Sequence, residues 1–213
     1  MIIQVFPSGP FETNAYIVAC PTTKKAAIID PAPESFDEIV SYISKNQLIA
    51  DKILLTHSHW DHIADVAPLK KHYSIPIHIH PEDAPNLEKP GSDGLPCWIP
   101  IEGVKPDNFF KDKEVVHVGN IAFEVIHTPG HTPGGVCFYS KKDHTLFSGD
   151  TLFKGSIGNL SFPTSNPSLM WSSLDKLAKL PSDTIVYPGH GPATTIGDES
   201  WLPNAKQIFG NMH

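Results

Sequence analysis

Short apolar segments separated by turn residues recur along the whole chain, and this pattern predicts a fold rich in short strands. Apolar runs bounded by proline, glycine or polar residues are typical of strands. Such runs occupy residues 2–6, 15–19, 26–29, 53–55, 75–79, 115–118, 121–126, 135–139, 145–147 and 184–187. Helical patterns follow both strand-rich stretches, so we expect two sheets packed face to face with helices outside, in a mixed α/β or α+β fold.

Helices are predicted where apolar residues recur at spacings of three and four. This spacing is present over residues 34–45, and again in the leucines of residues 167–180, so both segments are expected to form amphipathic helices. A further helix is expected through residues 66–70. Residues 81–113 contain six prolines and little periodicity, which predicts a long loop. A loop of this length in a compact domain is usually a lid or a binding loop.

Length and composition fit one globular domain over residues 1–213. Hydrophobic residues make up 40% of the chain and charged residues 18%, which are globular values. The formal net charge is −7 and the lysines are scattered, which disfavours a nucleic-acid partner. No apolar run reaches the length of a bilayer span and the first residues lack a basic leader, so we expect no membrane association.

The cysteines point to a reducing compartment. Cys20, Cys97 and Cys137 are odd in number and widely spaced, with no Cys-x-x-Cys motif. They therefore predict neither a disulfide framework nor a thiolate zinc site, and the cytoplasm is the expected location. The pattern does not indicate an oligomeric state.

A dense cluster of metal-binding residue types follows the strand at residues 53–55. His57 and His59 stand two residues apart just after this strand, so both imidazoles can point to one face. Asp61 and His62 follow where the chain turns toward a helix, and their side chains can reach a neighbouring position. Zinc accepts imidazole and carboxylate ligands, and a catalytic zinc usually has three protein ligands and one open position. This motif cannot complete two such sites alone.

Three residues at other strand ends are candidates for the missing ligands. His131 lies in Thr-Pro-Gly-His, Asp150 in Ser-Gly-Asp and His190 in Pro-Gly-His-Gly, and each follows an apolar strand. The adjacent glycines allow sharp bends and close backbone approach. His127 lies four residues before His131; it is expected to be structural, with a supporting role in the site as the alternative.

With these motifs, the sequence resembles the metallo-β-lactamase superfamily, and within it the short proteins similar to glyoxalase II. The resemblance covers nearly the whole chain and implies a four-layer αββα sandwich, an α+β fold. It also implies two divalent metal ions, zinc before iron or manganese. The implied ligands are His57, His59 and His131 for the first ion, Asp61, His62 and His190 for the second, and Asp150 between them.

The implied activity is hydrolysis of a small molecule by a hydroxide held between the two ions, with Asp61 and Asp150 as the catalytic residues. The expected substrate is a small thioester or ester, with hydroxyacylglutathione among the candidates. Three substrate-binding residues are proposed: Trp98 in the long loop, Lys154 as an anchor for an anionic group, and Asn159. Enzymes of the larger glyoxalase II type carry a basic residue at the position of Asn159, so glutathione is less firmly implied than hydrolysis.

Three other functions remain open at this point. A persulfide dioxygenase would hold a single iron on His57, His131 and Asp150, a ligand set suited to oxygen activation. A nuclease is disfavoured by the acidic net charge. A non-enzymatic metal-binding module is disfavoured by the complete ligand set, because a structural zinc site closes the positions that a catalytic site leaves open.

Overall fold

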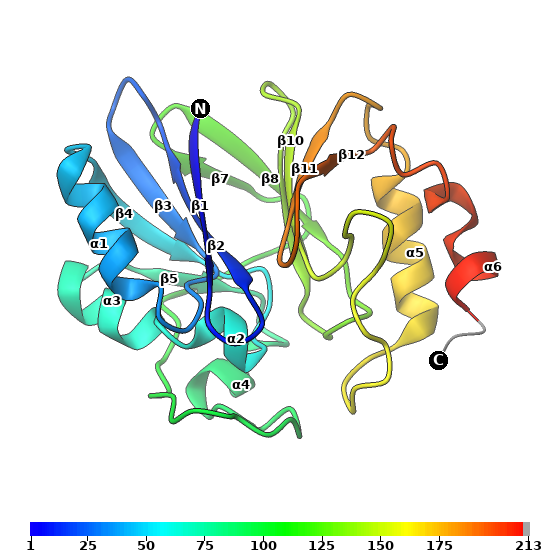
Figure 1. The fold of residues 1–213 in the computed structure, drawn as a ribbon, viewed down its shortest axis with the longest axis horizontal. Coiled ribbons are helices and arrows are strands. Elements are labelled where there is room, and N and C mark those ends of the chain that lie inside the picture. Colours follow the sequence, from blue (N-terminus) through cyan, green and yellow to red (C-terminus); the bar gives the residue numbers. More distant parts are fainter. Residues whose placement is uncertain (211–213) are drawn as a thin grey trace.

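The computed structural model describes residues 1–210, in which two six-stranded sheets pack against each other (Figure 1). The first three strands of the first sheet are antiparallel, and the remaining pairs are parallel. In spatial order this sheet contains β1 (Ile2–Ser8), β2 (Thr13–Ala19), β3 (Lys25–Ile29), β4 (Ile49–Leu54), β5 (Ile77–Ile79) and β6 (Asn108–Phe109).

The second sheet is antiparallel except for one parallel pair, β10 with β11. In spatial order it contains β12 (Thr194–Thr195), β11 (Ile185–Pro188), β10 (Thr145–Gly149), β9 (Val136–Ser140), β8 (Ile121–His127) and β7 (Val115–Val118). Both sheets are therefore mixed.

Helices cover the outer faces of both sheets. Figure 1 shows α1 and α3 outside the first sheet and α5 and α6 outside the second, which gives the four-layer αββα sandwich implied by the resemblance. The helices are α1 (Phe36–Lys45), α2 (Trp60–Ile63), α3 (Val66–Tyr73), α4 (Ala84–Glu88), α5 (Pro167–Leu177) and α6 (Ala205–Phe209), with a 3-10 turn at Leu202–Asn204. Among residues 1–210, no helix is long and apolar enough to cross a membrane.

The most continuous apolar runs of the sequence form strands that are buried on both faces, among them β2, β9 and β10. All seven residues of β2 are buried. Alternate side chains of a strand point to opposite faces, so Ile17 packs beneath α1 and α3 while Val18 packs against the second sheet. Phe123, Phe138 and Phe147 supply the second sheet's half of this central layer. Burial on both faces explains why the pattern is continuous rather than alternating.

Local backbone geometry moves some boundaries away from the sequence prediction. The first helix was expected from residue 34, but Glu34 has a left-handed φ of 67° and the helix begins at Phe36. The segment 81–113 was expected to be a loop, yet it contains α4 and β6. Helix α4 has only five residues, so tertiary contacts rather than periodicity hold it.

The strand ends bring the candidate ligands to one edge of the sandwich. Strands β4, β10 and β11 all end shortly before a candidate ligand, and β8 ends four residues before His131. Helix α2 lies at this edge, at the lower end of the sheets in Figure 1. Parallel strands such as β10 and β11 present their carboxyl ends at the same edge, which places Asp150 near His190.

Candidate metal centre

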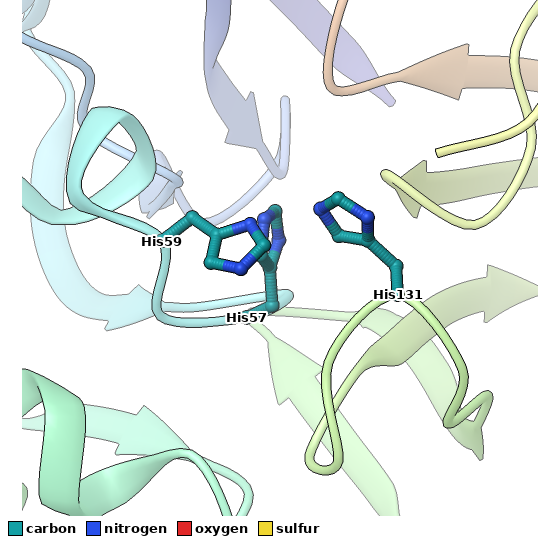
Figure 2. Close-up of side chains that lie close together, drawn as sticks. All are labelled: His57, His59 and His131. Carbon is teal, nitrogen blue, oxygen red and sulfur yellow. The ribbon is translucent and has the colours of Figure 1, made fainter. Parts of the chain in front are cut away.

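Three buried histidines form the first group of ligands. The side chains of His57, His59 and His131 converge from two loops (Figure 2), and one ligand atom from each lies within 4.8 Å of the others. Their rings stand nearly perpendicular, with interplanar angles of 82°, 76° and 82°. The Nε2 atoms of all three are buried without a hydrogen-bond partner. Buried polar atoms are normally paired, so three convergent orphaned nitrogens fit a missing cation.

A second group stands beside the first. One ligand atom from each of Asp61, His62 and His190 also lies within 4.8 Å of the others. Asp61 Oδ2 is 3.3 Å from His190 Nε2 and 3.5 Å from His62 Nε2. The two imidazole Nε2 atoms are 3.4 Å apart. A carboxylate and two imidazoles are suitable ligands for zinc or for iron.

Asp150 lies between the two groups. Its Oδ2 atom is 3.4 Å from Nε2 of His131 in the first group and 3.5 Å from Nε2 of His190 in the second. Its Oδ1 atom is 3.4 Å from Nε2 of His62. A single carboxylate therefore faces both groups, which is the arrangement that a shared ligand requires.

Glycine is required where the chain passes this carboxylate. A Cβ atom at Gly189 would lie 2.1 Å from Asp150 Oδ1 and 2.8 Å from His62 Cε1. At Gly149, where φ is +48°, a Cβ atom would lie 2.4 Å from Thr56 Oγ1. The two glycines let β10 and β11 end close against the ligands.

Burial and mutual charge set the protonation of the site. Burial lowers the pKa of His57 well below its usual value, and the nearby His62 adds to the effect. Burial also opposes protonation of His190, but Asp150 and Asp61 outweigh it and raise the pKa of His190 to about 10. Burial favours the neutral form of Asp61, yet His62 and a hydrogen bond with His190 lower its pKa to about 2. Neutral imidazole in the first group and ionised carboxylate in the second are the forms that bind a metal.

The second nitrogen of each of four ligand histidines is held by another group. His62 Nδ1 lies 3.1 Å from Asp30 Oδ2, and His57 Nδ1 lies 3.0 Å from Thr56 Oγ1. Backbone carbonyls hold the other two, that of Asn159 at 2.8 Å from His131 Nδ1 and that of Phe11 at 3.1 Å from His190 Nδ1. These contacts turn the Nε2 atoms toward the centre of the site, as is usual for metal-binding histidines.

Asp30 is not among the ligands or supporting residues predicted from the sequence. In the structure it is buried, has a φ of 48° and accepts hydrogen bonds from the backbone N–H and the hydroxyl of Thr56 as well as facing His62. Its role depends on a left-handed backbone conformation and on a contact 32 residues away. The Asp-Pro pair at residues 30–31 was the only signal in the sequence, and it indicated a turn.

Helix α4 joins the two loops that carry the first group. Asp83 precedes this helix and is buried; its Oδ2 accepts a hydrogen bond from Ser58 N at 2.9 Å, and its Oδ1 accepts one from Gly134 N at 2.6 Å. Asn86 donates to the carbonyl of Ser58 at 2.6 Å. Ser58 stands between His57 and His59, so its backbone is held from both sides.

The proposed substrate residues have different surroundings. Trp98 is exposed and packs against Phe11, with ring centroids 4.7 Å apart. The side chain of Asn159 accepts a hydrogen bond from Ser161 N at 2.8 Å, and its contact with the site is made by its backbone carbonyl. Lys154 is exposed in the turn that follows β10.

His127 contacts the loop that carries His131 and does not contact the side chain of a candidate ligand. Its Nε2 lies 3.0 Å from the carbonyl of Pro133, and its ring stacks on that of His80 with centroids 4.1 Å apart. His80, Glu82 and His127 also place three ligand atoms within 4.8 Å of one another. The imidazole rings of His80 and His127 are nearly parallel, at 13°, so one ion cannot lie in the plane of both. This pair is therefore a stacking contact.

Comparison with known proteins identifies the family of the chain. Residues 8–190 match the model of the metallo-beta-lactamase superfamily. The chain belongs to this superfamily. It is 35% identical over 206 residues to a protein named hydroxyacylglutathione hydrolase GloC from Haemophilus influenzae, and the match covers 93% of this chain and 95% of GloC.

Solved structures of the superfamily share the fold. The BLEG-1 B3 metallo-beta-lactamase superposes with a TM-score of 0.87 at 38% identity, covering 95% of this chain and all of BLEG-1. TTHA1623 in a di-iron-bound form has a TM-score of 0.81 at 37% identity, with 92% and 96% covered. ETHE1 from Myxococcus xanthus has a TM-score of 0.77 at 26% identity, with 95% and 84% covered. The metallo-β-lactamase fold expected from the resemblance is thus confirmed.

Proposed function

We propose that this chain hydrolyses a small thioester or ester with two divalent metal ions, most simply zinc, bound at the candidate metal centre. The position of Asp150, whose carboxylate faces both groups of ligands, supports this proposal most directly. His57, His59 and His131 would hold the first ion; Asp61, His62 and His190 would hold the second; Asp150 would bind both. The name of GloC favours a thioester among the candidate substrates.

The metal ions, when bound, supply Lewis-acid activation of water and of the substrate carbonyl. The protein's own groups orient that chemistry. Asp61 and Asp150 remain ionised at neutral pH, because the histidines around them hold their pKa below the usual range. Ionised carboxylates facing the centre accept a hydrogen bond from the attacking water and fix its direction. Thr13 donates to Asp61 Oδ2 at 2.6 Å, which fixes the orientation of that carboxylate.

Thioesters suit this arrangement because of their leaving group. A thiolate is stable near neutral pH and needs little protonation as it departs. No lysine or other acid from the chain is therefore required to donate a proton. Trp98, Lys154 and Asn159 stay the proposed substrate-contacting residues, and the cytoplasm stays the expected compartment.

A metal analysis with a substrate panel tests the proposal. Protein purified without added metal should contain close to two divalent ions per chain by elemental analysis. The zinc-loaded protein should hydrolyse members of a panel of acyl thioesters and esters that includes a hydroxyacylglutathione, and the chelated protein should not. Turnover near background across the whole panel by fully loaded protein would rule the proposal out.

The second candidate is an iron-dependent persulfide dioxygenase, favoured by the structural likeness to ETHE1. It would use His57, His131 and Asp150 on one iron. His131 and Asp150 face each other at 3.4 Å, as this ligand set requires. One iron per chain with oxygen uptake on a persulfide would support it, and two zinc ions per chain without uptake would exclude it.

A further inference from the structure

Three aromatic rings gather beside the second group of ligands. Phe11 lies at the turn between β1 and β2, Trp60 begins α2, and Trp98 comes from the segment after α4. The ring centroid of Phe11 is 5.3 Å from that of Trp60 and 4.7 Å from that of Trp98, and the two indoles are 5.9 Å apart. We call these three residues the aromatic wall.

Hydrogen bonds fix the aromatic wall to the metal ligands. The backbone carbonyl of Phe11 lies 3.1 Å from His190 Nδ1, and Thr13 in the same hairpin donates to Asp61. Trp60 is adjacent in sequence to Asp61. The rings therefore have a defined position relative to the second group of ligands and are not free to drift away from it.

The segment that carries Trp98 is also tied to the site. Asn86 donates to the carbonyl of Ser58, and its own carbonyl oxygen accepts hydrogen bonds from Gly91 N at 3.0 Å and Asp93 N at 3.2 Å. These bonds anchor the start of the segment only a few residues before Trp98. Figure 1 shows α4 and the segment after it on the same side of the sandwich as α2.

Two of the three rings of the aromatic wall are open to solvent. Trp98 is 62% exposed and Phe11 is 43% exposed, whereas Trp60 beneath them is buried. Exposed apolar patches of this kind are typical of binding sites rather than of ordinary surface. Aromatic side chains next to a few convergent polar groups are the usual lining of a small-molecule site.

Among cationic side chains near the site, a lysine is available to an anionic substrate group but an arginine is not. The 213-residue sequence contains no arginine, the side chain that binds carboxylates in a bidentate manner. The contacts found for the ligand histidines are to carboxylates, a hydroxyl and backbone carbonyls. The exposed rings of Phe11 and Trp98 therefore offer contact to an apolar group rather than to a charged one.

We propose that the aromatic wall binds the acyl group of the substrate, and that the chain prefers thioesters or esters of apolar acids. This inference rests on the proposed hydrolase function and names the substrate class. Phe11 and Trp98 would pack on the apolar chain from the solvent side, with Trp60 as the floor. Specificity would then come from the acyl part of the substrate, with little contribution from a charged leaving group.

A chain-length series tests this inference. The zinc-loaded protein is assayed with acetyl, butyryl, hexanoyl and octanoyl thioesters of one small neutral thiol. A fully buried methylene contributes up to about fourfold in affinity, and on a half-open surface we expect about a twofold gain in kcat/KM per methylene. Trp98→Ala and Phe11→Ala should flatten this slope, so that kcat/KM for the octanoyl compound falls much more than kcat/KM for the acetyl compound.

Phe109→Ala is the matched control, because Phe109 is an aromatic residue of similar exposure on β6 and makes no contact with the aromatic wall. It should keep the wild-type slope. A wild-type slope that is flat, or one that Trp98→Ala does not change, would overturn the inference. The inference would also be overturned if the wild-type protein were a dimer and Trp98→Ala dissociated it without changing the slope. The rings would then belong to an interface between two copies of the chain.

A binding measurement separates this inference from the proposed function. Non-hydrolysable thioethers with methyl and hexyl groups on the same neutral thiol are titrated against the zinc-loaded protein, with tryptophan fluorescence as the signal. If the hexyl compound binds more tightly than the methyl compound, and Trp98→Ala removes this difference, the proposed role of the aromatic wall is supported even if no thioester is turned over. If the protein hydrolysed the thioester panel but bound both thioethers equally, the proposed hydrolase function would stand and the proposed role of the aromatic wall would be rejected.

Discussion

Asp83→Asn tests whether the two loops of the first ligand group are held together by one carboxylate. Asp83 accepts from Ser58 N in the loop of His57 and His59, and from Gly134 N in the loop of His131. The amide of asparagine keeps one acceptor and places a donor against the other N–H. The variant should therefore loosen one loop from the other without leaving a cavity.

The size of the effect follows from the burial of these bonds. Each hydrogen bond to a charged group contributes about 1.5–3 kcal/mol, and an unsatisfied buried N–H costs about 1–3 kcal/mol. With one bond lost, we expect the free energy of unfolding of the metal-free protein to fall by about 2–3 kcal/mol. Groups that orient metal ligands typically change metal affinity by about 10–100-fold when replaced. Zinc binding by the first group should weaken within that range.

The assay combines urea unfolding of metal-free protein with zinc competition against a chromophoric chelator. Burial raises the pKa of Asp83 to about 6, so measurements at pH 8 keep the wild-type carboxylate ionised. Asp107→Asn is the control, because Asp107 also accepts from a backbone N–H, that of Ile77, but lies away from the ligands. Equal zinc affinity in Asp83→Asn and wild type would refute the role of Asp83 in aligning the two loops.

Three further outcomes are expected. Asp150→Ala should lower kcat/KM at least about a hundredfold and reduce the metal content by elemental analysis, and retained activity would contradict its place between two ions. Gly189→Ala should also lose metal, since its Cβ would meet the Asp150 carboxylate. Gly155→Ala, where φ is +72° but a Cβ has open space, should lower stability and keep the metal. Burial, with His127 adding to it, lowers the pKa of His80 to about 4. Below pH 6.5 the unfolded chain binds a proton at this residue that the folded chain does not bind, so the free energy of unfolding falls as the pH drops toward 4. Urea unfolding of metal-free protein should show that His80→Phe loses less stability than wild type over this pH range. Parallel curves of stability against pH for the two proteins would contradict the prediction.

Periodicity identified the strands and long helices because their burial is regular. Strand β2 is buried along its whole length and was recognised from its apolar run. Strand β4 was recognised only over its last residues, because its first half carries Asp51 and Lys52. These charges are accommodated at the sheet surface, where Asp51 pairs with Lys25 and Lys52 reaches the carbonyl of His117. Such pairs depend on neighbouring strands and leave no mark in the pattern of one strand.

The convergence of the candidate ligands could be predicted because metal chemistry restricts residue type and spacing. His57 and His59, two residues apart after a strand, indicated a shared position on their own. The groups that hold the ligands could not be predicted in the same way. Asp83 precedes a five-residue helix, and the carbonyl of Asn159 acts through the backbone, so residue type carries no signal. Their roles arise only when distant segments meet.

The same distinction explains why the reaction is better defined than the substrate. The proposed chemistry depends on seven side chains of types that bind metals, and the structure brings these side chains together. Substrate selection depends on Phe11 and Trp98, which come from a hairpin turn and from the long segment after α4. Either residue alone would be read as an ordinary exposed aromatic. Only their contact beside His190 gives them a common function, so the chain-length series examines the part of the molecule where sequence alone is least informative.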